Sequence, residues 1–243
     1  MSPLAEGAGV PLSYEQRGSG PPVLLVHGMA SGAPELAVVA EGLAGQARVI
    51  TYDRRGYGAS GAPQPYTGTT VMEQAEDAAE LLGSLGVREA VVAGEGFGAL
   101  VALDLLRRHP ILARAAVLAD PPLLAFVPEA TEALGAQRQR VDEALRASGP
   151  EAGVEAWLSG RVQGEALERA RASYRGFYAD FAGLASWPAT RGELRAIAQP
   201  TVVLTSPQTA PAIRAASERL AELLPAVTRA DDGDLVAAIR LLV

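Results

Sequence analysis

Cysteine, lysine and asparagine are absent from this 243-residue sequence, and only two histidines occur, His27 and His109. Without cysteine the chain cannot form disulfides, use a thiolate nucleophile or hold zinc through thiolates. Two histidines are too few for a multi-histidine metal site, so we expect no metal. All 21 basic residues are arginines, and 28 acidic residues bring the formal net charge to −7. Since no basic patch stands out, we predict no nucleic-acid partner.

Long apolar runs are absent as well. No stretch approaches the ~18 apolar residues that a transmembrane helix needs. The first residues have neither the charged start nor the apolar middle of a signal peptide. We therefore predict a cytoplasmic protein with no membrane partner. With 49% hydrophobic and 20% charged residues, the length fits one large α/β domain or two small ones around a sizeable core.

Short apolar runs alternate with segments of helical periodicity along most of the chain. Such alternation is typical of an α/β fold with a doubly wound, mostly parallel sheet. Thr70 and Glu73 stand three residues apart before a helical pattern, which predicts a capping box. We predict strands at 23–26, 49–52, 90–93, 115–118 and 201–204, and helices near 71–85, 100–108 and 213–224.

Residues 121–188 interrupt this alternation, since the segment is helix-like and holds both tryptophans. We interpret it as a helical cap over the strand ends, which leaves residues 1–120 and 189–243 as the core domain. Aromatic side chains in such a segment mainly pack the cap onto the sheet. Three of them are nevertheless candidates for contact with a substrate: Trp157, Tyr174 and Tyr178.

Four segments of the chain, taken together, resemble the α/β-hydrolase fold superfamily. GSGPPVLLVHGM (18–29) is similar to the strand and oxyanion loop, and YDRRGYGASGAP (52–63) to the next strand and its Arg-Gly turn. VVAGEGFGALVALDLLRRHP (91–110) resembles the nucleophile elbow with its flanking strand and helix, and LRAIAQPTVVLT (194–205) the strand before the acid loop. The resemblance points to the cap-bearing branch of epoxide hydrolases, C–C hydrolases and cofactor-free haloperoxidases, and implies no cofactor.

The catalytic positions that the resemblance implies carry other residues. The family's elbow reads G-x-nucleophile-x-G, and residues 94–98 place Gly96 at the nucleophile, where it cannot attack a substrate. The loop 205–209, which follows the strand at the family's acid position, contains no carboxylate, and Asp234 stands where the histidine is expected. Because triad chemistry needs a nucleophile, a base and an orienting group, serine or aspartate hydrolysis is not expected.

Other parts of such a site can survive without the triad. The resemblance implies an oxyanion hole made of the backbone N–H groups of Met29 and Phe97. Asp234, at the histidine position, and Asp120, at an alternative acid position of the family, are the candidate acid–base groups, because a carboxylate buried under a cap has a raised pKa. We expect the Glu95 side chain to point away from the pocket and to pair with an arginine.

Three functions remain open at this point. The main prediction is a cofactor-free, non-hydrolytic cyclase, lyase or isomerase that acts on a largely apolar small molecule of specialised metabolism. One alternative is a non-catalytic pseudoenzyme that binds a ligand or a partner. The other is a weak hydrolase in which a carboxylate activates water directly. Fold resemblance alone does not decide between them, since function depends on the site.

Overall fold

The computed structural model describes residues 2–123, 127–184 and 187–243. Its centre is an eight-stranded sheet in the order β1-β2-β4-β3-β5-β6-β7-β8. The first two strands are antiparallel, and β3 to β8 run parallel, which confirms the predicted doubly wound α/β sheet. The strands are β1 (Leu4–Glu6), β2 (Pro11–Arg17), β3 (Pro22–Val26), β4 (Arg48–Tyr52), β5 (Ala90–Glu95), β6 (Ala113–Ala119), β7 (Thr201–Leu204) and β8 (Val227–Ala230).

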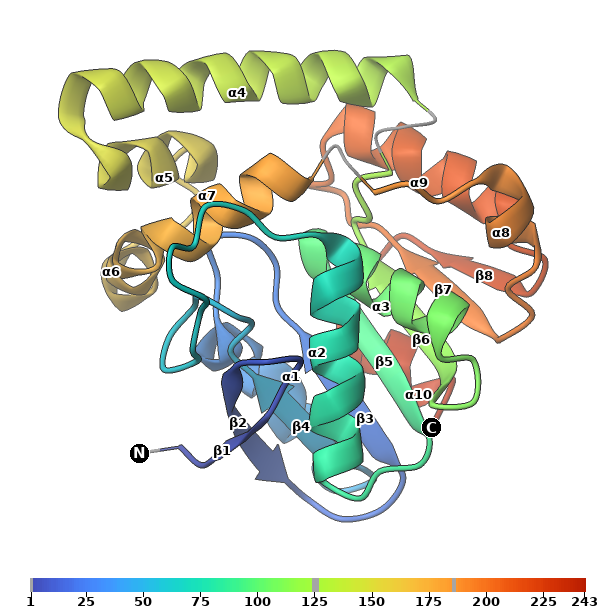
Figure 1. Cartoon of the computed structure of the whole chain (residues 1–243). Helices are drawn as coiled ribbons and strands as arrows, with labels where there is room; N and C mark the ends of the chain where they lie inside the picture. The colour runs from blue at the N-terminus through green and yellow to red at the C-terminus, as the bar shows by residue number, and fades with distance from the viewer. Residues whose placement is uncertain (1, 124–126, 185–186) are drawn as a thin grey trace.

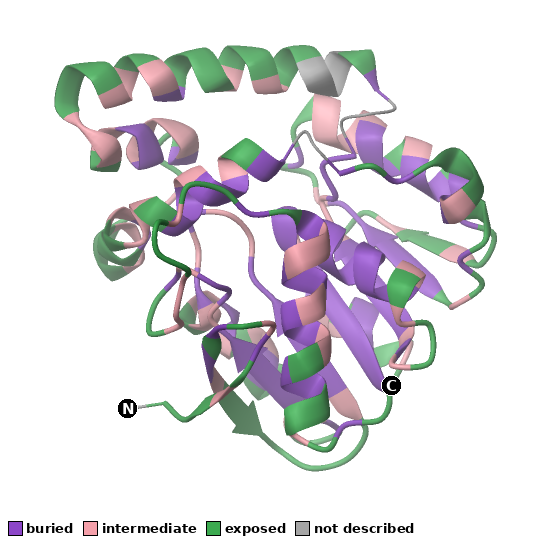
Figure 2. Cartoon of the chain, viewed as in Figure 1, coloured by how far each residue is buried: buried purple, intermediate pink, exposed green. Residues whose placement is uncertain are grey.

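Helices cover both faces of the sheet, as Figure 1 shows. The central strands are buried on both sides and read as nearly continuous apolar runs, as parallel strands between two helical layers do. One buried cluster joins the sheet to α2, α3, α8 and α9, and a second joins it to α1 and α10. Figure 2 shows that the strands at the centre of the sheet are buried. These helices are α1 (Ala37–Leu43, after the 3-10 turn Ala33–Leu36), α2 (Val71–Ser84), α3 (Phe97–Arg108), α8 (Arg191–Arg195), α9 (Pro211–Leu223) and α10 (Leu235–Arg240).

Four further helices lie beyond the carboxyl ends of the parallel strands (Figure 1). Residues 124–126 and 185–186 of the predicted cap lie outside the described residues. The division into a core and a cap with the bounds given above stays a prediction. The helices are α4 (Pro128–Ser148), α5 (Pro150–Leu158), α6 (Gly164–Ala172) and α7 (Tyr174–Gly183).

The order of the strands locates the site. From β3 the chain passes to β4 on one side, and it then returns to add β5 on the other side of β3. In open α/β sheets such a reversal leaves a crevice at the carboxyl ends of the two diverging strands, where ligands bind. The loops that follow β3 and β5 are those predicted to form the oxyanion hole and the nucleophile elbow.

The capping box predicted at the start of α2 is only half formed. Thr70 caps this helix, and its side chain accepts a hydrogen bond of 3.0 Å from the backbone N–H of Glu73. The carboxylate of Glu73 does not close the predicted capping box, because it accepts a hydrogen bond from Thr69 and pairs with Arg55. Among the described helices, none is long and apolar enough to cross a membrane.

Candidate active site

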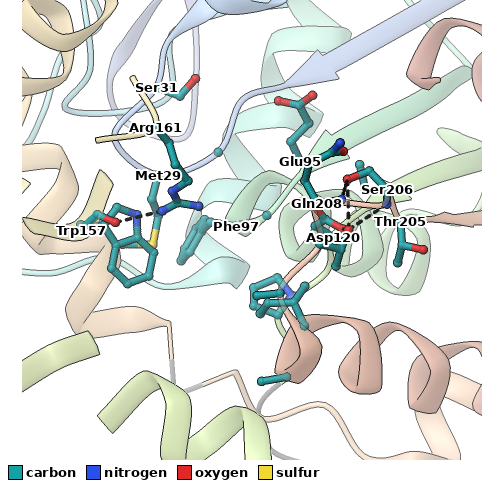
Figure 3. Close-up of a pocket in the computed structure, with 18 of the residues that line it drawn as sticks. Met29, Ser31, Glu95, Phe97, Asp120, Trp157, Arg161, Thr205, Ser206 and Gln208 are labelled. Atoms are coloured by element: carbon teal, nitrogen blue, oxygen red, sulfur yellow. Dashed lines mark hydrogen bonds between the residues drawn. The ribbon is translucent and has the colours of Figure 1, made fainter. Parts of the chain in front are cut away.

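A cavity of about 830 Å³ is lined by the loops at the carboxyl ends of the strands and by residues of α4 and α5. The four helices α4 to α7 are called the cap helices below. Figure 3 shows its two sides. Asp120 and Ser206, which follow β6 and β7, lie on one side, while Trp157 and Arg161 from the cap lie on the other with Met29 and Phe97. The cavity therefore combines apolar walls with a few polar groups, as small-molecule sites do.

The elbow between β5 and α3 keeps its sharp turn without a nucleophile. Gly96 has φ 54° and ψ −117°, a conformation that residues with a side chain rarely adopt. A Cβ at Gly94 would overlap the carbonyl of Gly98, so the close packing of the turn requires glycine there. A Cβ at Gly96, by contrast, would meet no described atom within 4 Å apart from those of its chain neighbours. The space in front of Gly96 is therefore open.

Two residues of the cavity lining have backbone N–H groups without an acceptor among the described residues. Phe97 is the first residue of α3, where a helix leaves its N–H groups without an intrahelical partner. The N–H of Met29 donates to no group among the described residues. These are the two donors that the resemblance predicted, and both residues belong to the cavity lining. Their catalytic role stays a prediction.

Hydrogen bonds to the preceding carbonyl, that of Gly28, fix the direction of the Met29 N–H. The Gly28 carbonyl accepts hydrogen bonds from Arg54 Nη2, at 2.9 Å, and from His27 Nδ1, at 2.8 Å. In a trans peptide the carbonyl and the next N–H point in opposite directions. A carbonyl held by the buried Arg54 therefore aims the N–H of Met29 away from Arg54, and the charge of Arg54 strengthens it as a donor.

His27 is part of this support and does not supply a base. Its Nε2 accepts a 2.9 Å hydrogen bond from the backbone N–H of Arg54, which places the ring proton on Nδ1. Burial and the charge of Arg54 hold the pKa of His27 well below its ordinary value, so the ring is neutral. His109 lies at the end of α3 and contacts Glu76. Neither histidine belongs to the described cavity lining.

Asp120 is the carboxylate best placed for chemistry. It follows β6 with φ +48°, and Thr209 Oγ1 donates a 2.7 Å hydrogen bond to its Oδ1. Thr209 in turn accepts a 2.7 Å hydrogen bond from the Ser206 N–H. The loop after β7, which carries no carboxylate of its own, therefore orients the side chain of Asp120. Burial raises the pKa of Asp120, while the Thr209 hydrogen bond and the charge of Arg214 oppose the rise.

The arginine partner predicted for Glu95 is not found among the described residues. It belongs to the cavity lining, and no described residue donates a hydrogen bond to its carboxylate or forms an ion pair with it. Burial and the negative charge of Asp120 both raise the pKa of Glu95. The elbow pattern gave the position of Glu95, and the predicted direction of its side chain away from the pocket stays a prediction.

The remaining candidates lie apart from this cluster. Asp234 is exposed and caps α10, accepting a 2.9 Å hydrogen bond from the N–H of Ala237, and it is not among the described lining residues. Trp157 lines the cavity. Tyr174 and Tyr178 pack within the cap, where the Tyr178 hydroxyl donates to Pro150, and they are not part of the described lining. Their predicted contact with a substrate stays untested.

Sequence reasoning missed Thr209 and Arg161. The hydroxyls of the loop 205–209 come directly after a buried strand, which is a weak signal for a site. Arg161 has no such signal, because its place depends on how the cap folds. Among the described residues, no group of three or more histidine, cysteine or acidic side chains is arranged to hold a metal ion.

Comparison with known proteins gives consistent matches. The family model described as "alpha/beta hydrolase fold" matches residues 21–149. "Uncharacterized hydrolase YraK" of Bacillus subtilis is 39% identical over 116 residues, 48% of this chain and 43% of that protein. The 2-(acetamidomethylene)succinate hydrolase of Mesorhizobium japonicum is 31% identical over 153 residues, 63% of this chain and 52% of that protein. The chain thus spans about half the length of these curated relatives.

A solved structure matches over almost its whole length. A thermophilic esterase from Thermogutta terrifontis is 26% identical in sequence, with a TM-score of 0.81. The match covers 100% of this chain and 97% of that chain. These relatives are named hydrolases or an esterase, so the main prediction of a non-hydrolytic cyclase, lyase or isomerase was wrong. The similarities favour instead the alternative of a hydrolase in which a carboxylate activates water, because such a reaction needs no side-chain nucleophile.

Proposed function

The chain belongs to the alpha/beta hydrolase fold family, and from this premise we propose that it is a hydrolase in which Asp120 activates water to cleave an acyl ester or amide bond. The position of Asp120 carries the proposal. It shares one cavity with Gly96 and with the N–H donors of Met29 and Phe97. Thr209 holds its Oδ1, and no described residue donates to its Oδ2.

The proposed reaction needs no covalent enzyme intermediate. Water attacks the acyl carbon while the carboxylate of Asp120 takes one of its protons. The carbonyl oxygen becomes negatively charged and is held by the N–H groups of Met29 and Phe97, as in other oxyanion holes. When the tetrahedral intermediate collapses, the bond to the leaving group breaks, and that group takes the proton back from Asp120.

The open space at Gly96 supports water as the nucleophile. A serine at this position would place its oxygen in front of the elbow, where the acyl carbon must lie to reach the two N–H donors. Glycine leaves that volume free, and no described atom apart from those of its chain neighbours would lie within 4 Å of a Cβ there. The substrate we propose is a small molecule with an apolar part, since Met29, Phe97 and Trp157 are among the apolar residues of the lining.

The raised pKa of Asp120 gives the proposed reaction a pH dependence. Only the ionised carboxylate accepts a proton from water, so the rate rises with pH through the pKa of Asp120 and then levels off. Because burial raises this pKa above its ordinary value of 3.8, the rise occurs at a higher pH than for an exposed aspartate. A base closer in pKa to neutral pH also accepts a proton more readily.

The test is hydrolysis of p-nitrophenyl butyrate by the wild-type chain, Asp120→Asn and Asp234→Asn. We expect Asp120→Asn to lose about 10²- to 10⁴-fold in kcat, because the amide cannot accept the proton. Asp234→Asn keeps an acceptor for the cap of α10 and is expected to keep the activity. After incubation with a fluorophosphonate or with substrate, mass spectrometry should find no adduct on the wild-type chain.

Two results would contradict this function. One is turnover by the wild-type chain no faster than in buffer. The other is full activity in Asp120→Asn, which would move the base elsewhere, with Asp234 as the first alternative if its own variant is inactive. A covalent adduct on Ser31 or Ser206, which both line the cavity, would replace water by a side-chain nucleophile.

A further inference from the structure

Arg161 is the one positively charged side chain among the described residues that line the cavity. It follows α5 in the cap, and the other charged residues of the lining are Glu95 and Asp120. Figure 3 shows its guanidinium reaching toward Met29 and Phe97, on the side of the cavity opposite Asp120. The cation therefore lies near the proposed oxyanion donors and away from the proposed base.

Two backbone carbonyls hold the guanidinium in place. Arg161 Nε donates to Leu158 O, and Nη2 donates to Trp157 O, each at 2.9 Å. Trp157 O also accepts from Gln137 Nε2 at 3.1 Å. The side chain is thus tied to the last turn of α5, while Nη1 has no partner among the described residues. Such fixation lowers the entropy lost when an anion binds.

The charge of Arg161 is not neutralised by the protein. No described carboxylate lies within ion-pair distance of its guanidinium. Arg169 and Arg171 of the cap do form ion pairs, with Glu35 and Glu155 at 2.7 Å each, whereas Arg146 forms none among the described residues but lies outside the described cavity lining. Capping the carboxyl end of α5 explains the two bonded nitrogens. Arg161 is exposed, so water solvates its charge, and because the side chain belongs to the cavity lining an anionic ligand can replace that water.

We propose that Arg161 forms a carboxylate-binding subsite, and that the substrate is an acyl ester or amide whose acyl part carries a second, ionised carboxyl group. A guanidinium binds a carboxylate through directed, charge-assisted hydrogen bonds. The anionic end lies at Arg161, the scissile carbonyl lies at Gly96, and Asp120 is on the far side, where it repels the anion least. That the ligand is a substrate rests on the proposed hydrolysis, whereas carboxylate binding does not.

Binding is measured first, with stable amides that the protein need not cleave. Succinamate, glutaramate and adipamate each carry one carboxylate and one amide, and butyramide and valeramide are neutral comparisons. We expect isothermal titration calorimetry of the wild-type chain to show at least one anionic amide binding about 10- to 100-fold more tightly than the neutral ones. The preference should weaken as salt increases, because the pair is partly exposed to solvent.

Three variants assign the preference to Arg161. Arg161→Gln removes the charge and is expected to abolish the preference, while Arg161→Lys keeps the charge without the fork and retains part of it. Arg146→Gln is the matched control, an exposed arginine of the cap helix α4 outside the described cavity lining. It should bind like the wild type. Circular dichroism and melting temperature confirm that each variant is folded.

The outcomes separate this subsite from the proposed function. No preference for anionic amides, or a preference that persists in Arg161→Gln, overturns the subsite. Arg161-dependent binding without any ester hydrolysis supports the subsite and contradicts the hydrolase. In kinetics, mono-p-nitrophenyl glutarate should exceed p-nitrophenyl butyrate in kcat/KM, and Arg161→Gln should remove this advantage mainly through KM. Hydrolysis of both esters at equal kcat/KM would support the hydrolase and overturn the subsite.

Discussion

Glu95 and Asp120 both belong to the cavity lining, and the charge of Asp120 acts on Glu95. The pKa of Glu95 is raised by burial first and by the negative charge of Asp120 second. Asp120 has compensation that Glu95 does not have, since Thr209 donates to it and the charge of Arg214 lowers its pKa. Glu95 therefore lacks the groups that offset the cost of ionising Asp120.

Glu95→Gln should stabilise the protein at neutral pH. A carboxyl group whose pKa is raised on folding favours the folded state at low pH, and this contribution is lost as the pH rises through the folded-state pKa. Above that pKa, glutamine avoids the buried charge. The melting temperature of Glu95→Gln should exceed that of the wild type at pH 7, and the difference should shrink toward pH 4.5, the ordinary pKa of glutamate.

Glu89→Gln serves as the control, because Glu89 is exposed just before β5. Its melting temperature should follow that of the wild type at both pH values. A Glu95→Gln variant that is less stable than the wild type at pH 7 would show that the carboxylate has a stabilising partner in solution, and the assignment of Asp120 as the sole base would then need revision.

At the scale of elements, the elbow between β5 and α3 combines two glycines with opposite requirements. Gly94 lies against the carbonyl of Gly98, where a side chain has no room. Gly96 has room but a positive φ, so a side chain there costs backbone strain without a clash. A nucleophilic side chain at this position would be held in the same strained backbone conformation. Glycine avoids that strain and leaves the volume in front of the elbow open.

The pair Gly94→Ala and Gly96→Ala separates these requirements. We expect Gly96→Ala to fold and to lose about 1–3 kcal/mol, the cost of a residue held at a sparsely populated backbone conformation. Gly94→Ala must push apart β5 and the start of α3, and it should lose more or fail to accumulate as soluble protein. Urea denaturation measures both. Equal losses would show that the turn relaxes around either methyl group.

The same elements show what sequence alone could predict. The strands β3, β5 and β7 were predicted because their apolar runs are buried on both faces, and the elbow because its glycines have fixed spacing. Strand β8 (Val227–Ala230) was missed, since as an edge strand it is largely exposed and its pattern is not apolar. The missing arginine partner of Glu95 and the place of Arg161 in the cavity depend on packing between segments far apart in the chain, which no local pattern records.

At the scale of the whole molecule, a buried ion pair ties the cap to the oxyanion loop. Arg54 lies in the loop after β4, and Asp180 lies in α7. Arg54 Nη2 and Asp180 Oδ2 are 2.7 Å apart, and both side chains are almost completely buried. Asp180 also accepts hydrogen bonds of 2.6 Å from Tyr57 and Gln74. Because Arg54 also holds the Gly28 carbonyl, the position of the cap and the direction of the Met29 N–H are linked.

Asp180→Ala should therefore destabilise the molecule and weaken catalysis together. Removing one member of a buried pair leaves Arg54 charged and unpaired, which costs about 3–5 kcal/mol. Urea denaturation measures this loss, and Asp142→Ala, on the cap helix α4 next to Arg138, is the control and should change stability little. In the folded Asp180→Ala protein, kcat for ester hydrolysis should fall more than KM changes, because the oxyanion donor acts in the transition state. An unchanged kcat would show that the Gly28 carbonyl holds its direction without Asp180.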